Sequence, residues 1–142
     1  MHTADVPVTI GRAIEVRNGK DATIISTGRQ LPNALAAAET LATEGIQCRV
    51  LSMHTWKPLD IDAVIAAARE TGGIVTVEEH LAQGGFGSAV LEALADAGVS
   101  PTAFTRLAIS DEFPKGVGMQ DHFLEQYHLT PTGIANAVKS MR

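Results

Sequence analysis

The chain has 142 residues, of which 45% are hydrophobic and only 4% aromatic, and its formal net charge is −5 at pH 7. Its length suits one domain with a single buried core, while the negative charge and the few aromatic side chains argue against a nucleic-acid surface. No apolar run approaches the roughly 20 residues of a membrane span, no signal peptide is evident, and the lone Cys48 cannot form an internal disulfide, so we expect a cytoplasmic protein.

The beginning of the chain predicts a loose segment followed by a hairpin. Residues 1–9 have no periodic pattern, so they are interpreted as a flexible opening segment or the edge of a trimmed piece, and residues 10–142 as one domain. Alternating side chains over 13–17, an Asn-Gly turn dipeptide and a β-branched run over 22–26 then predict two antiparallel strands joined by a tight turn.

The rest of the chain alternates helix and strand patterns. Apolar residues three and four apart predict a helix that starts near Pro32 and ends before Gly45, and Asp60 is a good N-cap for a second helix. Further strands are predicted over 48–53, 74–77 and 106–109, and further helices over 88–97, 119–127 and from Thr130 onward. This alternation predicts a three-layer α/β/α sandwich around a mostly parallel five-stranded sheet with one antiparallel edge strand.

The stretch from Ile74 to Val90 holds the main candidate site. A buried strand runs directly into Glu78, Glu79 and His80, and ligands of open α/β sheets usually bind at the carboxyl ends of strands. A histidine beside two carboxylates tends to have its cationic form stabilised. We therefore expect His80 to form a hydrogen bond at an interface, or alternatively to contact a substrate phosphate.

The glycines that follow have two interpretations. Gly84 and Gly85 allow the backbone to approach a ligand closely, and a helix that opens at Ser88 would offer unpaired amides to an anion, a carboxylate or a neighbouring chain. Alternatively, they serve only the geometry of the turn. No P-loop is present, and Val90 stands where a dinucleotide-binding fingerprint would have its third glycine, so a nucleotide site is not supported.

His54 is a further candidate, because it follows the strand predicted over 48–53. A His-Thr-Trp segment at a strand end can line a ligand groove, whereas a lone tryptophan before Lys-Pro more often anchors its loop on a neighbouring helix. The histidines of the chain have no spacing typical of metal ligands, so we predict no metal site.

Four segments in order along the chain carry a resemblance to a known family: Asp21–Gly28, Met53–Asp60, Val77–Val90 and Ile109–Phe113. The most specific motifs are Met-His-Thr-Trp-Lys-Pro-Leu-Asp in the second and Glu-Glu-His-Leu-Ala-Gln-Gly-Gly in the third. Together the segments resemble the carboxyl-terminal domain of transketolase and related thiamine-diphosphate enzymes. They favour compact or split transketolases over deoxyxylulose-phosphate synthases and 2-oxoacid dehydrogenase β subunits, which are similar in outline.

The resemblance implies an auxiliary part of an enzyme. In such enzymes thiamine diphosphate lies between a pyrophosphate-binding domain, whose Gly-Asp-Gly segment holds the metal, and a pyrimidine-binding domain, whose glutamate activates the ring. This chain has no Gly-Asp-Gly segment, so the resemblance implies no catalytic and no cofactor-binding residue here, and thiamine diphosphate with Mg²⁺ only in the complete enzyme. The expected partners are those two domains or subunits, and a second copy of the chain.

Two hypotheses follow. The first is the carboxyl-terminal section of a transketolase-like enzyme that moves two-carbon ketol units between sugar phosphates; this section supports assembly and dimer formation and is inactive alone. The equivalent domain of a deoxyxylulose-phosphate synthase or of a 2-oxoacid dehydrogenase β subunit is a variant of it. The second is a stand-alone α/β module whose strand end and glycine loop hold a small anionic or regulatory ligand.

Overall fold

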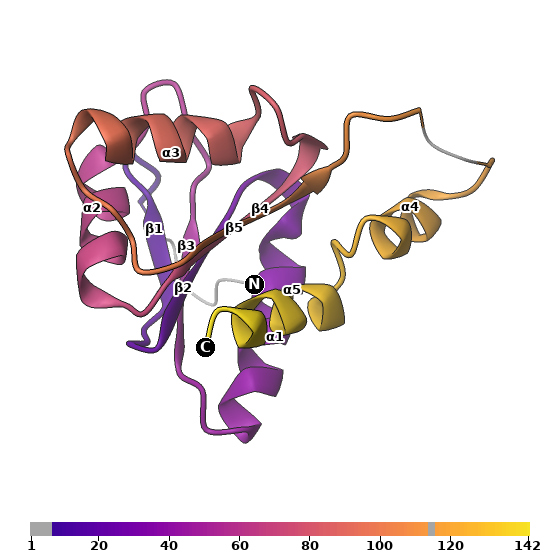
Figure 1. Ribbon diagram of the computed structural model, residues 1–142, viewed down its shortest axis with the longest axis horizontal. Coiled ribbons are helices and arrows are strands. Elements are labelled where there is room, and N and C mark those ends of the chain that lie inside the picture. Colours follow the sequence, from indigo (N-terminus) through magenta and orange to yellow (C-terminus); the bar gives the residue numbers. More distant parts are fainter. Residues whose placement is uncertain (1–6, 114–115) are drawn as a thin grey trace.

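The computed structural model describes residues 7–113 and 116–142, and it shows one mixed sheet between two layers of helices (Figure 1). The strands are β1 (Ile14–Arg17), β2 (Ala22–Ser26), β3 (Cys48–Ser52), β4 (Ile74–Leu81) and β5 (Phe104–Ile109). The helices are α1 (Leu31–Thr43), α2 (Ile61–Glu70), α3 (Phe86–Asp96), α4 (Gln120–Gln126) and α5 (Pro131–Ser140), with a short 3₁₀ turn over Gly28–Gln30 before α1. The flexible segment predicted at 1–9 falls largely on residues 1–6, which lie outside the described residues.

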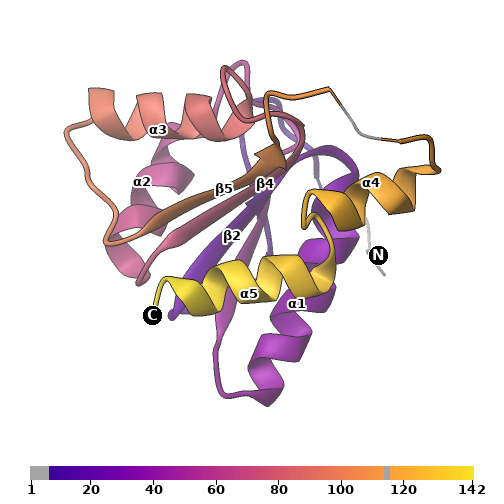
Figure 2. The same cartoon turned by 45° about the vertical axis from the view of Figure 1, so that its right-hand side comes forward.

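Two pairs of helices cover the two faces of the sheet. The buried residues of α1 and α5 share one core cluster with β2 and β3, and those of α2 and α3 belong to a second cluster. Figure 2 shows α1 and α5 on one side of the sheet, with α2 and α3 on the other. The predicted three-layer sandwich, with a mostly parallel five-stranded sheet and one antiparallel edge strand, is confirmed.

The hairpin predicted between the first two strands is wrong. The strand order is β1-β3-β2-β4-β5, and β1 pairs antiparallel with β3, so that Glu15 lies opposite Leu51. β2 lies between β3 and β4 and is parallel to both. All five residues of β2 are buried, so this strand needs a neighbour on each side, whereas the half-exposed β1 fits the edge of the sheet.

Four strands run parallel to one another: β2, β3, β4 and β5. Their carboxyl ends lie at the same end of the sheet, which we call the carboxyl rim. Because β1 runs the other way, its first residue, Ile14, lies opposite Ser52 at the end of β3. The segment before β1 is held there too, since the N–H of Gly11 donates a hydrogen bond to Thr55 Oγ1 at 2.8 Å. The chain therefore enters the sheet at the carboxyl rim, where the loops after the parallel strands also begin.

The helix caps agree with the prediction, but three boundaries differ by two residues or more. Asp60 and Thr130 each accept an N–H from the first turn of their helices, at 3.2 Å in both cases. β4 continues to Leu81, so the acidic end of the predicted strand lies within it, and β5 starts two residues earlier than predicted, at Phe104. α3 starts at Phe86 instead of Ser88.

Candidate functional site

A cavity of about 320 Å³ opens at the carboxyl rim, between the ends of β2 and β4 and the loop after β3. Its lining includes Arg29, Trp56, Glu78, Glu79, His80 and Phe86. The structure thus brings three of the predicted site residues to one cavity. The other three, His54, Gly84 and Gly85, are not part of its lining.

Glu78 is buried, with 1% of its surface exposed, and caps α3 from the neighbouring strand. Its two carboxylate oxygens accept the N–H of Phe86 at 2.5 Å and the N–H of Gly87 at 2.7 Å. A carboxylate at this position also has a favourable interaction with the positive end of the helix. Two of the amides expected to be unpaired at the start of this helix, those of Phe86 and Gly87, are thus bound by Glu78 of the same chain.

The two glycines differ in what requires them. Gly84 has a φ of +69°, in the left-handed region, with open space around the position of a Cβ. Gly85 has no such φ, but a Cβ there would collide with the Leu81 carbonyl and the Glu78 carboxylate. Gly84 therefore serves the turn, and Gly85 leaves room for the cap.

Glu79 joins three elements around the rim. Its Oε1 accepts a hydrogen bond from Gln30 Nε2 at 2.7 Å, and its Oε2 accepts one from Gln120 Nε2 at 2.9 Å. Gln30 is fully buried and is held in turn by Asn33, whose Nδ2 donates to Gln30 Oε1 at 3.1 Å. Gln30 is not among the residues predicted for the site, because no local pattern relates it to a glutamate 49 positions away.

His80 is exposed at the rim, and its Nδ1 lies 3.3 Å from the carbonyl oxygen of Leu81. The interface hydrogen bond and the phosphate contact expected of His80 stay predictions. In the described part of the chain no ion pair includes His80. The reason is that Glu78 and Glu79 are both engaged elsewhere, by backbone amides and by glutamine side chains. The imidazole is thus accessible from the cavity.

The loop after β3 contributes both to the packing of the domain and to the lining of the cavity. His54 is half-buried, and its Nε2 is enclosed without a hydrogen-bond partner among the described residues. Trp56 packs edge-on against Phe86 of α3, with 6.5 Å between ring centroids and an interplanar angle of 81°. Lys57 Nζ lies 5.3 Å from the centre of the Trp56 ring, within the range of a cation–π contact. Trp56 therefore anchors its loop on a helix and also lines the cavity.

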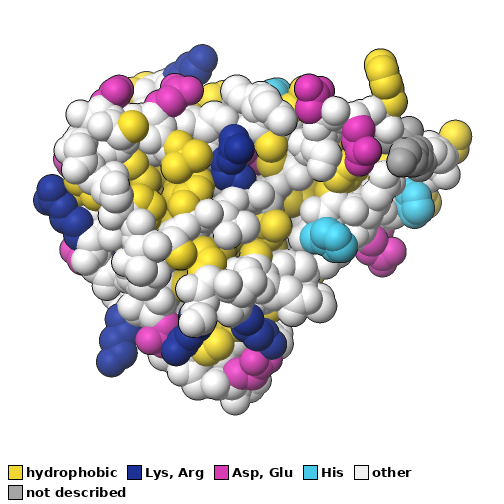
Figure 3. All heavy atoms as spheres, in the orientation of Figure 1, with side chains coloured by type: hydrophobic (Ala, Val, Ile, Leu, Met, Phe, Trp, Pro, Cys, Tyr) yellow, Lys and Arg dark blue, Asp and Glu magenta, His cyan; other side chains and the backbone are white. Residues whose placement is uncertain are grey.

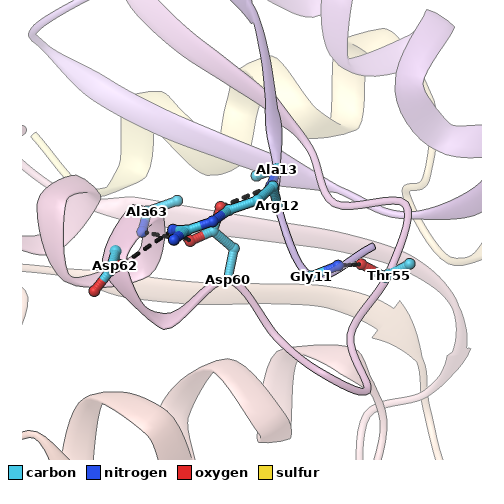
Figure 4. Close-up of polar contacts among 7 residues, drawn as sticks. All are labelled: Gly11, Arg12, Ala13, Thr55, Asp60, Asp62 and Ala63. Carbon is cyan, nitrogen blue, oxygen red and sulfur yellow. Dashed lines mark hydrogen bonds and ion pairs between the residues drawn. The ribbon is translucent and has the colours of Figure 1, made fainter. Parts of the chain in front are cut away.

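Asp60 fixes the opening segment to the rim (Figure 4). It is 6% exposed, and while Oδ1 caps α2, Oδ2 accepts the N–H of Ala13 at 2.7 Å. Arg12 Nη1 lies 3.5 Å from Asp60 and 3.1 Å from Asp62. The hydrogen bond to Asp62 and the attraction of Asp60 raise the pKa of the Arg12 guanidinium. The sequence showed Asp60 as a cap but gave no sign of this second role.

Large apolar side chains remain exposed on the segment that leaves the rim after β5. Phe113, Val117 and Met119 are 95%, 103% and 84% exposed, and we call these three side chains the apolar arm. Figure 1 shows the segment projecting from the sheet before α4, and Figure 3 shows hydrophobic side chains standing out at its outer end. Three large apolar side chains this exposed along one segment of the chain add up to apolar surface that a partner could cover.

The residues of this chain do not fit thiamine diphosphate. The sequence lacks a Gly-Asp-Gly segment, and the amides at the start of α3, where a diphosphate would be well placed, are held by Glu78. Within residues 7–113 and 116–142, no three His, Cys, Asp or Glu side chains are grouped so that they could hold a metal ion. None of the described helices has the length and apolar character needed to cross a membrane.

Comparison with known proteins places the chain in a family. Residues 11–134 match the transketolase C-terminal domain. The chain is 42% identical to 1-deoxy-D-xylulose-5-phosphate synthase of Gloeobacter violaceus over 94% of its own length and 20% of that protein. It is 41% identical to the 6-deoxy-6-sulfo-D-fructose transketolase subunit SqwH of a Clostridium species, over 91% of its own length and 39% of that protein.

A solved structure shows the same fold. It is described as a split gene transketolase in an inactive β4 tetramer, and it superposes with a TM-score of 0.87 and 36% sequence identity, over 96% of this chain and 44% of that one. The chain thus spans less than half the length of each of these relatives. From the family match and the shared fold, we conclude that the chain belongs to the transketolase C-terminal domain family.

Proposed function

We propose that this chain is the carboxyl-terminal section of a transketolase-type enzyme that moves two-carbon ketol units between sugar phosphates, and that it supports assembly without catalysing the reaction itself. The observation that carries the proposal is the apolar arm, whose three large side chains are almost fully exposed. A domain that works inside a larger enzyme needs a face that neighbours cover. The relatives extend well beyond the matched region, so their additional polypeptide is the natural neighbour.

The partners in this proposal are the pyrophosphate- and pyrimidine-binding domains or subunits, which would hold thiamine diphosphate and Mg²⁺ in the complete enzyme. The carboxyl rim is the face proposed to dock on them, because the apolar arm, the cavity and the opening segment all lie there. Glu79 and His80 would contribute polar contacts to this interface, whereas His54, whose Nε2 is enclosed, would support it through the packing of the loop after β3. Gly84 and Gly85 would support it indirectly, by shaping the loop that follows β4.

A second candidate within the same family is the equivalent domain of a deoxyxylulose-phosphate synthase, which the 42% identity to such a synthase favours. The identity between this chain and the transketolase subunit is nearly the same, 41%. Because the sequence motifs favour the transketolases, the transketolase section is the preferred proposal.

A stand-alone module that binds a small anion is the less favoured function. The anion of that hypothesis binds at the strand end and the glycine loop, where the Glu78 carboxylate already accepts the Phe86 and Gly87 amides. A second anion beside this buried carboxylate would be repelled.

We also propose that residues 10–142 form one domain, that the chain acts in the cytoplasm, and that it self-associates when its partners are absent. The similar chain described as an inactive β4 tetramer supports both self-association and the lack of activity alone.

The test is affinity capture of the tagged chain from its own cells, followed by intact-mass analysis of the bound polypeptides. We expect a stoichiometric polypeptide with a Gly-Asp-Gly segment, or a longer form of this chain that contains one. Where the partner is a separate polypeptide, the double variant Phe113→Ser/Met119→Ser should lose it. Leu91→Ser, which alters an exposed apolar side chain on α3, should retain it. The proposal would be overturned if the chain were recovered alone, or if Leu91→Ser lost the partner polypeptide to the same extent as the double variant.

A further inference from the structure

A second hollow of about 330 Å³ lies beneath α4, beside the ends of β4 and β5. Its walls are mostly apolar and come from Ile109, Phe123, Leu124, Tyr127 and Leu129. Two polar side chains, Glu79 and Gln120, complete the lining. The volume and the apolar lining with few polar groups are typical of a cleft for a small organic molecule.

Glu79 is the charged group of this hollow, and its present partners are neutral. Gln30 and Gln120 donate one amide N–H to each carboxylate oxygen, at 2.7 and 2.9 Å. An ionised carboxylate offers about four acceptor positions, so roughly two remain for another donor. Among the residues that the structure describes, none forms an ion pair with Glu79.

The mouth of the hollow can adjust to a ligand at low cost. Gln120 is exposed and is the first residue of α4, a helix of seven residues of which none is buried. Elements with few buried contacts open with small free energies. A donor on a ligand can therefore join or replace the Gln120 amide at Glu79 without disturbing the core of the sheet.

We propose that this hollow binds a small primary amine that carries an aryl or short alkyl group. The ammonium would donate to the free acceptor positions of Glu79, and the apolar group would pack on Phe123 and Leu124. The ammonium also adds a Coulomb attraction to the carboxylate, which the uncharged amide donors Gln30 and Gln120 do not supply. The net charge of −5 also favours a cationic ligand over an anionic one. The inference rests on this hollow and does not depend on the proposed function.

Three chemical probes with one aromatic body test the proposal: 2-phenylethylamine, 2-phenylethanol and phenylacetate. Each is titrated into the ¹⁵N-labelled chain, and amide shifts are followed by NMR. We expect 2-phenylethylamine to shift amides over residues 120–129 and at Glu79, with an affinity at least five-fold above that of 2-phenylethanol, and phenylacetate to bind least. Equal affinities for the three probes, or no localised shifts, would overturn the proposal.

Two variants separate the charge from the hollow. Glu79→Gln should abolish the preference for the amine over the alcohol, while the alcohol still binds. Leu124→Trp should weaken both by filling the hollow, in a chain whose remaining spectrum shows it to be folded. The matched control is Glu92→Gln, which removes the charge of an exposed glutamate on α3 and should keep the preference. If Glu79→Gln still prefers the amine to the alcohol, the preference comes from the overall charge of the chain, and the proposed site is contradicted.

Discussion

The carboxylate of Glu78, in β4, accepts the N–H of Gly87, in the first turn of α3, at 2.7 Å. A second hydrogen bond to the Phe86 amide completes the contact, and the carboxylate is almost fully buried. The strand and the helix are thus joined by a side chain at the point where the backbone turns between them. This cap organises the loop beside His80 and gives the carboxyl rim a fixed shape.

Glu78→Gln should lower the free energy of unfolding by about 2 kcal/mol, because one of the two buried amides would face an NH₂ group and lose its acceptor. The measurement is urea denaturation followed by circular dichroism. Glu92→Gln makes the same chemical change on the exposed face of α3 and should stay within about 0.5 kcal/mol of the unchanged chain. A similar loss in both variants would show that general charge, and not the cap, is responsible.

Gly85→Ala should destabilise the chain more than Gly84→Ala. A methyl group at Gly85 collides with the Leu81 carbonyl and the Glu78 carboxylate, so the cap must move, at a cost of about 2 kcal/mol or more. At Gly84 the methyl group meets open space, and only the left-handed φ of +69° opposes it, for about 1 kcal/mol. Denaturant midpoints of the two variants give the comparison. The reverse order would mean that the turn, and not the cap, limits this loop.

Asp60→Ala should destabilise the chain by about 2–3 kcal/mol, since the amides of Ala13 and Ala63 both lose their acceptor. Hydrogen exchange should become faster at the Ala13 amide in particular. Asp62→Ala is the control, because its side chain is 82% exposed and its contact with Arg12 is a surface ion pair, so its loss should leave the free energy of unfolding nearly unchanged. Unchanged exchange at Ala13 in Asp60→Ala would argue against this anchor.

Stability should fall at alkaline pH through Cys48, which is fully buried in β3. Burial, with a smaller contribution from Asp21, raises the pKa of its thiol from 9.0 to about 11. As the pH rises, the unfolded chain loses the thiol proton first, so the free energy of unfolding is unaffected below pH 9 and falls between 9 and 11. By pH 10 the loss due to this group is about 1 kcal/mol.

The measurement is denaturation of the unchanged chain and of Cys48→Ala at pH 8 and pH 10. The difference between the two free energies of unfolding should shrink by about 1 kcal/mol at the higher pH, because alanine cannot ionise. Other groups that titrate in this range are common to both chains and cancel. A constant difference would show that the folded thiol ionises as readily as the unfolded one.

The sequence predicts most of the elements because their signals are local. The spacing of apolar residues gives the helices, and the caps at Asp60 and Thr130 involve amides only three positions away. The pairing of β1 is not local. The Asn-Gly dipeptide after it is typical of a hairpin, but the full burial of β2 requires β3 and β4 on its two sides, and β1 is left for the outer edge.

The candidate site is harder to predict than the fold, because it depends on contacts between distant residues. Glu78 and Glu79 are adjacent and alike in the sequence, yet Glu78 is buried against helix amides and Glu79 is exposed and bound to Gln30 and Gln120. The alternation of side chains along a strand separates them, but which one faces α3 depends on how that helix packs. The carboxyl rim itself could be expected from the rule on strand ends.

The anchor between Asp60 and Ala13 also bears on how this domain meets its partners. With the backbone held at Gly11 and Ala13, a polypeptide joined ahead of these residues would be tethered at the rim that also gives rise to the apolar arm. Such a tether would hold docking partners together at an effective concentration of about a millimolar. If the domain and its partners are separate chains, no tether raises their effective concentration. The contacts of the docking face alone would then have to supply the free energy of association.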